Sequence, residues 1–384
     1  MRPFAKYVFI SREMPSETVV GGIATYYWHL LSTLGSEQQV WITSSASDRL
    51  PENDRAVVHR FRAEHIKRRL SLLERALQPV RFAWFRVAVA FTVLRYMAHG
   101  RLHVETPEYG ADAIGLVLLK WLFPRRLHLH VRGHGPSGWN RAKGEIAWRH
   151  CGNFGKLYYP LEQCLLRAAD VVSTPTEYMA TILSRAPGMV RQRAVVVPNP
   201  FSTSLVREVA EASRATRTQR ELSGKALVFL GTWMPAKGSE EFERLVTAWD
   251  IPPTDVLVLG SDPGRTCPFP RSVLPYRTLL GYLSAERPRV FVGGLHEAFG
   301  YALLDAAALG ARVITRDTPA TREVGAHFDV QGLVFFRKIE NLVADERPLE
   351  KMPFASVGAT MEGDLYLRAI LERSSAREAA LLQS

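Results

Sequence analysis

Residues 296–315 constrain the fold of this chain more than any other segment. They read HEAFGYALLDAAALGARVIT, an apolar helix-forming run that ends at Gly310 and is followed by a β-branched strand. Two carboxylates, Glu297 and Asp305, stand around the start of that helix. A buried carboxylate without a partner is costly, so we expect a polar group to meet Asp305. Glu297 precedes Gly300 and is expected in the turn before the helix, where free N–H groups and the positive dipole end favour an anion.

One extended ligand would satisfy both carboxylates and the helix start. Its phosphates would lie at the helix N-terminus, and each carboxylate would bind a hydroxylated group on one side of them. A nucleotide sugar has this shape. The alternative is that Glu297 only complements the helix dipole, while Asp305 faces solvent or caps a neighbouring group.

The segment resembles the glutamate-x7-glutamate signature of family-four glycosyltransferases, which are retaining enzymes with the two-domain GT-B fold. The match covers Glu297, Ala298, Phe299, Gly300, Ala307, Gly310 and residues 313–314, with Asp305 in place of the second glutamate. The resemblance implies that Glu297 hydrogen-bonds the transferred sugar, beside the backbone of Phe299, Gly300 and Tyr301. It also implies that Asp305 holds the ribose, with a shorter reach than the usual glutamate.

The order of the elements predicts an α/β protein with two domains, since 384 residues are enough for two separate cores. Strand-like runs alternate with helical patterns, as in parallel sheets. The expected strands cover 7–11, 39–43, 101–104, 127–131, 171–173, 195–197, 226–231, 255–259, 290–292 and 313–314. We therefore expect two Rossmann-like domains facing across a cleft, with residues 1–200 on the acceptor side and 201–363 on the donor side. Residues 364–384 form a C-terminal helix that packs back on the first domain.

A second motif opens the donor domain, where the strand at 226–231 is followed by Thr232, Lys237 and Gly238. Lys237 stands near a helix start, where it could neutralise a diphosphate; the alternative is a solvated lysine. The family carries Gly-Arg-x-x-x-x-Lys-Gly here, so Lys237 matches and Thr232 replaces a donor-binding arginine. The resemblance makes both positions donor contacts, and Arg265 is a candidate to supply the missing charge.

Two positions in the first half point to the same ligand. Gly22, in a glycine pair after the first strand, would let the backbone approach the donor phosphates, although such a pair also makes ordinary turns. His134 follows the strand at 127–131, at the end where α/β proteins place functional groups. Its position resembles the family's sugar-contacting histidine, and a purely structural loop role is the alternative. Residues 105–110 are expected to form an acidic turn on the acceptor side.

Composition points away from metals and disulfides. Three cysteines without paired spacing favour a reducing compartment, and we expect a cytoplasmic protein. No Asp-x-Asp sequence occurs, so we expect a metal-independent enzyme with no metal site and no cofactor besides its nucleotide-sugar substrate. His128 and His130 alternate along a strand and are expected to make local hydrogen bonds. The resemblance then assigns catalysis to Glu297, His134 and Lys237.

A basic segment suggests a partner surface. Residues 57–100 carry nine lysines and arginines against two glutamates. Arg60, Arg62, Lys67, Arg68 and Arg69 precede an apolar stretch with several aromatic residues, a combination that an anionic membrane surface attracts. The alternative is that the aromatics form core. Nucleic acid is disfavoured because no binding motif accompanies the charge.

These features predict a glycosyltransferase that acts on a hydroxyl acceptor, whether a glycan, a lipid-linked molecule or a small molecule. A non-catalytic protein on the same fold, or a nucleotide-sugar epimerase, is the alternative. The missing arginine at Thr232 favours the non-catalytic protein, whereas the joint presence of Glu297, Lys237 and Asp305 favours the enzyme.

Overall fold

The computed structural model describes residues 4–13, 21–35, 39–43, 56–61, 72–140, 145–151, 153–185, 194–213, 222–261, 266–343 and 352–383. The chain forms two compact units. The first comprises Met1–Asn140, Gly144–Pro200 and Glu362–Ser384, and the second comprises Arg141–Lys143 and Phe201–Met361.

The first unit is built on a seven-stranded sheet with the order β3-β2-β1-β4-β5-β8-β9, in which all neighbours are parallel. Its strands are β1 (Lys6–Ser11), β2 (Gln39–Thr43), β3 (Ala56–Arg60), β4 (Leu102–Pro107), β5 (Leu127–Arg132), β8 (Val171–Thr174) and β9 (Ala194–Val196). Its helices are α1 (Gly22–Thr33), α2 (Leu72–Met97), α3 (Gly115–Leu122), α4 (Asn153–Ala168), α5 (Glu177–Ser184) and α13 (Gly363–Gln383). A short hairpin pairs β6 (Trp139–Asn140) with β7 (Glu145–Ile146).

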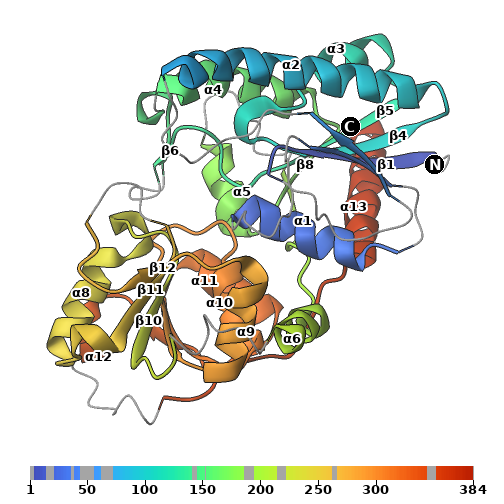
Figure 1. The fold of residues 1–384 in the computed structure, drawn as a ribbon. Coiled ribbons are helices and arrows are strands. Elements are labelled where there is room, and N and C mark those ends of the chain that lie inside the picture. Colours follow the sequence, from blue (N-terminus) through green and yellow to red (C-terminus); the bar gives the residue numbers. More distant parts are fainter. Residues whose placement is uncertain are drawn as a thin grey trace. The chain divides into compact units, whose positions relative to one another are not determined.

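Alternation along the strands gives this sheet two different faces. Leu102 and Val104 of β4 point into a hydrophobic core with residues of α2, α3 and α4. His103 and Glu105 point the other way, where α1 packs against α13 (Figure 1). The period of two residues in a strand therefore separates an apolar face from a polar face.

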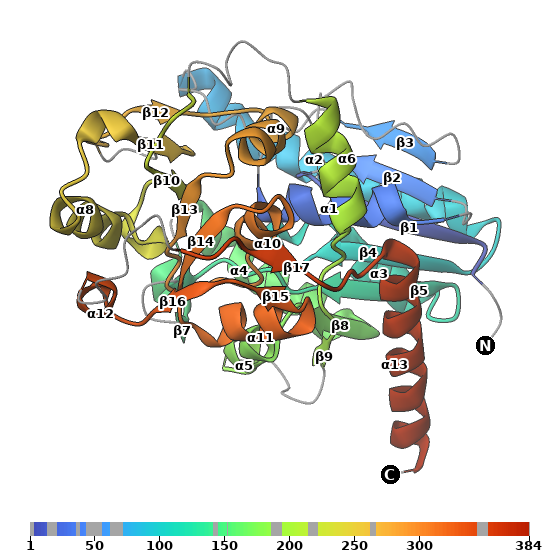
Figure 2. The same ribbon diagram turned by 90° about the horizontal axis from the view of Figure 1, so that it is seen from below.

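The second unit has a six-stranded parallel sheet with the order β12-β11-β10-β13-β14-β16. Its strands are β10 (Leu227–Leu230), β11 (Val256–Leu259), β12 (Arg271–Ser272), β13 (Arg289–Val292), β14 (Arg312–Arg316) and β16 (Val334–Phe336). Its helices are α6 (Thr203–Ala212), α8 (Ser239–Ala248), α9 (Tyr276–Glu286), α10 (Tyr301–Ala308), α11 (Pro319–His327) and α12 (Ile339–Val343). Short strands β15 (Val330–Gln331) and β17 (Ser356–Val357) pair separately, and Figure 2 shows them beside α10 and α11.

Stacked aromatic rings fill the core of the second unit. The ring of Phe291 in β13 stacks on Phe229 of β10 and on Phe336 of β16, with centroids 6.1 and 5.3 Å apart. Trp233 and Phe242 meet edge to face nearby. These large side chains fix the strands whose carboxyl ends carry the loops described below.

The expected strands are confirmed within a few residues, and β2 has the predicted bounds. One boundary was wrong. We expected a strand at 101–104 followed by an acidic turn at 105–110, but β4 continues to Pro107 and Glu105 is buried inside it. The strand is longer because Glu105 and Thr106 pair with β5, although the proline that follows them is typical of a turn. No helix among the described residues combines the length and the hydropathy that a membrane crossing requires.

Candidate functional site

An ion pair joins the two motifs of the second unit. Lys237 closes the short 3-10 helix η4 (Pro235–Lys237) after β10, and Glu297 lies in the loop after β13. Because β10 and β13 are parallel neighbours, these loops leave the same edge of the sheet. Lys237 Nζ pairs with Glu297 Oε1, and the two side chains are 23% and 13% exposed. The sheet therefore brings together two charges that are distant in sequence and keeps them within reach of solvent.

Glycines let these two loops come close. Gly238 has a φ of +87°, and a Cβ there would lie 2.7 Å from the carbonyl oxygen of Gly293. The amide of Leu295 donates to the carbonyl of Ala236 at 3.0 Å, so the loops are also joined through their backbones. A larger residue at position 238 would push Lys237 away from Glu297.

The helix α10 begins directly after Glu297. Gly300 is its cap with a φ of +97°, and Tyr301 is its first residue. Phe299 and Tyr301 are buried, with ring centroids 4.9 Å apart, so these rings anchor the loop and leave its backbone to face a ligand. The positive end of the helix dipole adjoins the ion pair and adds to the attraction for an anion.

Asp305 lies on α10 and is 3% exposed. The hydroxyl of Tyr276, at the start of α9, lies 2.9 Å from each carboxylate oxygen and is the polar partner that the sequence called for. The alternative of a solvent-facing carboxylate is therefore wrong. Burial raises the pKa of Asp305 to about 7, and the hydrogen bond from Tyr276 opposes that rise. A ligand that offers two hydroxyl groups could bind here in place of Tyr276.

The position of the missing arginine holds a small polar contact. Thr232 Oγ1 lies 3.3 Å from Ser261 Oγ. Arg265, the proposed replacement, lies outside the described residues. A cation that the sequence reasoning missed is Arg316, at the end of β14: its Nε donates to the carbonyl of Gly293 at 3.2 Å, and its guanidinium pairs with Glu241. An arginine that closes a β-branched strand at its carboxyl end is the signal that could have identified it.

In the first unit, Gly22 begins α1 and His134 follows β5. A Cβ on Gly22 would meet no atom of the described residues within 4 Å. The ring of His134 packs edge to face on Tyr26 of α1, with centroids 4.8 Å apart, which brings the histidine to the helix that Gly22 starts. Burial, followed by the charge of Arg132, holds the pKa of His134 well below its usual value. Its ring is therefore neutral, and Nε2 has no hydrogen-bond partner among the described residues.

Glu108 holds the His134 loop in place. Both of its carboxylate oxygens accept the amide of His134 at 2.9 Å, and Oε1 also accepts the amide of Gly135. Glu108 is buried, and this burial raises the pKa of its carboxyl to about 7 despite these bonds. Within the expected acidic turn, Glu108 thus acts as a scaffold for the backbone beside His134.

A buried polar network lies on the α1 and α13 side of the first sheet. His130 Nδ1 lies 3.1 Å from Glu105 Oε2, and its Nε2 lies 2.6 Å from Ser173 Oγ. The hydroxyl of Tyr26 donates to Glu105, and Arg132 donates to Ser173 Oγ at 2.8 Å. All of these side chains are fully buried.

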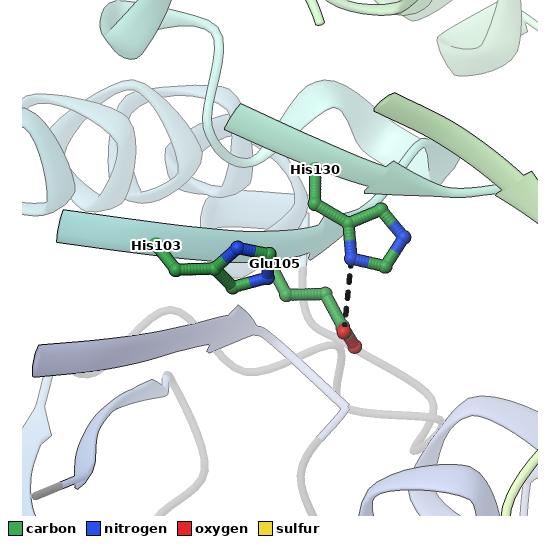
Figure 3. A group of neighbouring side chains, drawn as sticks. All are labelled: His103, Glu105 and His130. Carbon is green, nitrogen blue, oxygen red and sulfur yellow. Dashed lines mark ion pairs between the residues drawn. The ribbon is translucent and has the colours of Figure 1, made fainter. Parts of the chain in front are cut away.

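Part of this network is the group in the described chain that could hold a metal ion. His103, Glu105 and His130 each offer a ligand atom, and these atoms lie within 4.8 Å of one another (Figure 3). Zinc binds its ligands at about 2.0–2.2 Å, so a formed site would bring them to about 3.5 Å. In the structure, these three side chains hydrogen-bond to His128, Tyr26 and Ser173. The histidine pair of β5 bonds locally as expected, since His128 Nδ1 lies 3.0 Å from His103 Nδ1.

The structure thus brings together Lys237, Glu297 and the backbone of 299–301, with Asp305 deeper on the same helix. Thr232 lies on the same loop as Lys237. Gly22 and His134 come together in the first unit through Tyr26.

The sequence matches no protein-family model and no curated protein. Solved structures match along the whole chain. A trehalose-6-phosphate synthase, OtsA, matches with a TM-score of 0.61 at 10% identity, over 99% of each chain. HepE of Anabaena, solved with UDP and glucose, matches with 0.59 at 14% identity, over 99% of this chain and 100% of its own. A sucrose-phosphate synthase from Thermosynechococcus elongatus matches with 0.57 at 15% identity, over 98% of each chain.

These matches show the fold. The chain has the GT-B fold of two Rossmann-like domains, as the sequence predicted. Identities this low carry architecture and leave the reaction to be argued from the residues.

Proposed function

We propose that this protein is a retaining glycosyltransferase that moves a sugar from a nucleotide-diphosphate donor to a hydroxyl acceptor without a metal ion. The observation that carries this proposal is the ion pair of Lys237 and Glu297 beside the start of α10. The fold supports it, because solved structures with this fold include trehalose-phosphate and sucrose-phosphate synthases.

A diphosphate that binds here would break the ion pair by competing with Glu297 for Lys237. Without ligand, Lys237 neutralises Glu297 in a loop that is only partly exposed. A diphosphate carries more negative charge than a carboxylate and would compete for the ammonium group. Glu297 would then accept hydrogen bonds from the sugar, while the phosphates take Lys237 and the amides at the start of α10.

In the proposed reaction, the bond between the anomeric carbon and the phosphate oxygen breaks as the acceptor oxygen bonds to that carbon from the same face. Lys237 and the dipole of α10 stabilise the charge on the leaving diphosphate. The proton of the acceptor hydroxyl passes to the departing phosphate oxygen. No separate catalytic base is then required.

The remaining residues would bind and orient. Asp305 would accept the ribose hydroxyls, and Thr232 would contact the diphosphate with its hydroxyl. The neutral ring of His134 offers an unbonded Nε2 for a hydroxyl of the transferred sugar. Gly22 leaves room for backbone to approach the phosphates.

The test is a panel of nucleotide sugars in which thermal stabilisation and slow hydrolysis are recorded for the wild type and for Glu297→Gln. We expect one donor to stabilise the protein and to be hydrolysed. In Glu297→Gln, turnover should fall by at least about ten-fold while the free nucleoside diphosphate binds as tightly or more tightly, because Lys237 loses its internal competitor. Unchanged turnover in this variant would contradict the proposal.

Glu340→Gln is the matched control. It also removes a carboxylate from an ion pair with a basic residue, Arg244, but both side chains are more than half exposed. We expect neither turnover nor nucleotide affinity to change. The products separate the alternatives: free nucleotide indicates transfer, an isomerised nucleotide sugar indicates an epimerase, and binding without turnover indicates a non-catalytic protein.

A further inference from the structure

Helix α2 is apolar on two faces. One face, which includes Phe82, Phe85, Val89 and Val93, is buried in the core of the first unit. Aromatic residues here are therefore core, as the alternative interpretation of the sequence held, but only in part. A helix that is apolar all round normally has a cover on both sides.

The second face of α2 is an exposed apolar stripe. It is formed by Leu77, Val80, Trp84, Val87, Phe91 and Leu94. Trp84 is 60% exposed and Phe91 is 68% exposed. The residues recur every three or four positions, so they lie along one side of the helix.

Helix α3 extends this stripe. It packs against α2 and lies on the same side of the sheet (Figure 1). Its last turn and the next residue expose Trp121, Leu122 and Phe123, with Trp121 at 78%. Large exposed apolar surfaces of this kind mark sites that bind a partner or a membrane.

Along the chain, basic residues outnumber acidic ones around these side chains. Between residues 77 and 127 the chain contains three acids, Glu105, Glu108 and Asp112, and all three are buried. Arg95 and Arg125 are exposed and form no ion pair with a residue that the structure describes. The α2–α3 surface means these exposed apolar residues with Arg81, Arg95 and Arg125. It is apolar and basic, and Asp170, which adjoins α3, is neutralised by its ion pair with Lys120.

This charge pattern selects the partner. Packing against a second copy would bring arginines toward arginines, which is unfavourable. An anionic lipid surface meets both properties, since Trp, Phe and Leu enter the boundary of the acyl chains while arginines reach the head groups. The basic residues Arg62, Lys67, Arg68 and Arg69 of the earlier sequence argument lie outside the described residues and are not needed for it.

We propose that the α2–α3 surface docks the first unit onto anionic membrane lipid. This inference deepens the proposed function, on which it rests only for its consequence: the hydroxyl acceptor is then presented at the membrane, as a lipid-linked molecule. The docking itself involves no donor and no residue of the candidate site.

Vesicle sedimentation at physiological ionic strength tests the docking. The full chain should bind vesicles of equal parts phosphatidylglycerol and phosphatidylcholine, and should bind phosphatidylcholine alone at least about ten-fold more weakly. The triple variant Trp84→Ser, Phe91→Ser, Trp121→Ser and the double variant Arg95→Glu, Arg125→Glu should each lose at least about ten-fold in binding. All five positions are exposed, so thermal melting should show that these variants fold.

Two control variants carry the same kinds of substitution at positions outside the α2–α3 surface. Val273→Ser removes an apolar side chain that is 64% exposed in the second unit, and Lys338→Glu with Arg368→Glu matches the charge change of the double variant. Both should bind vesicles as the wild type does. Glu297→Gln should also bind normally, which separates this proposal from that of glycosyl transfer.

The proposal fails if anionic vesicles do not retain the protein, if neutral vesicles retain it equally, or if the stripe and arginine variants bind unchanged. It also fails if light scattering shows a dimer that the triple serine variant dissociates, because a second copy would then cover this surface.

Discussion

Two charged clusters in this protein contain similar groups and differ in exposure. In the second unit, Lys237 and Glu297 form an ion pair whose side chains are partly exposed. In the first unit, Glu105 and Arg132 are fully buried and are linked through His130 and Ser173. The Lys237–Glu297 cluster contains an ion pair that a ligand from solvent can replace, whereas the Glu105–Arg132 cluster is linked by hydrogen bonds among fully buried side chains.

The difference teaches how to separate a binding cluster from a structural one. A buried charge must find its hydrogen bonds within the protein, as Glu105 does from Tyr26 and Arg132 does to Asn199. A partly exposed pair at the end of parallel strands can exchange its partner for an anion. Residue type alone does not distinguish the two cases, and burial does.

The largest effect is expected for Arg132→Met. The change removes the buried guanidinium that donates to Asn199, Ser173 and the carbonyl of Val197, and with it a positive charge of the network that contains Glu105. We expect the free energy of unfolding to fall by about 3–5 kcal/mol in chemical denaturation. The exposed Arg125→Met is the control and should stay within about 0.5 kcal/mol of wild type. Equal stabilities of the two variants would break the comparison.

A smaller effect, on binding rather than stability, is expected for Lys237→Ala. Loss of the ammonium should weaken donor binding and turnover by at least about ten-fold, or about 1.4 kcal/mol. Thermal melting should change little, because the pair is partly exposed. Arg244→Ala, which breaks the exposed pair with Glu340, should change neither. Normal donor affinity in Lys237→Ala would exclude this lysine from the site.

The pH dependence of stability should differ between two aspartates of the second unit. The folded pKa of Asp305 is raised to about 7, so its contribution to stability is present below its ordinary pKa of 3.8 and is lost as the pH rises to about 7. Asp305→Asn should therefore reduce the loss of stability between these pH values in denaturant titrations.

The pKa of Asp317 is shifted in the opposite direction to that of Asp305. Its hydrogen bond with Arg322, opposed by burial and aided by Arg337, lowers its pKa to about 2. Its contribution is present above pH 3.8 and is lost as the pH falls toward 2. Asp317→Asn should therefore reduce the loss of unfolding free energy as the pH falls from 3.8 toward 2. It should not change how the unfolding free energy varies near neutral pH. The same pH profile in both variants would show that neither carboxylate is shifted as stated.

The smallest effect is expected for metal removal. Excess chelator should leave the melting temperature and the turnover unchanged, because His103, Glu105 and His130 each hydrogen-bond to another side chain, namely His128, Tyr26 and Ser173. As a control, the variant His103→Gln receives the same chelator treatment as the wild type. A loss of activity that zinc or magnesium restores in the wild type and not in the variant would turn this structural cluster into a metal site.

Much of the candidate site could be predicted from local sequence. Gly238, Gly300 and Gly310 mark where helices begin or end, and the alternation of strand and helix places Lys237 and Glu297 at one edge of a sheet. Parallel connectivity makes this placement nearly automatic. The partner of Asp305 could not be predicted, since Tyr276 begins a helix that lacked any distinctive motif.

The sequence by itself determined the order of the strands and helices along the chain and supplied enough apolar residues for two domain cores, because these depend on spacing and composition. It also predicted candidate residues for binding a diphosphate. Only the tertiary structure decided which polar side chains are buried away from solvent. Glu105 became a buried strand residue because pairing with β5 continued past it. The two apolar faces of α2 are similar in sequence, and packing against the sheet buried Phe85 while Trp84 stayed in solvent. Burial depends on contacts between distant segments, and no local pattern records them.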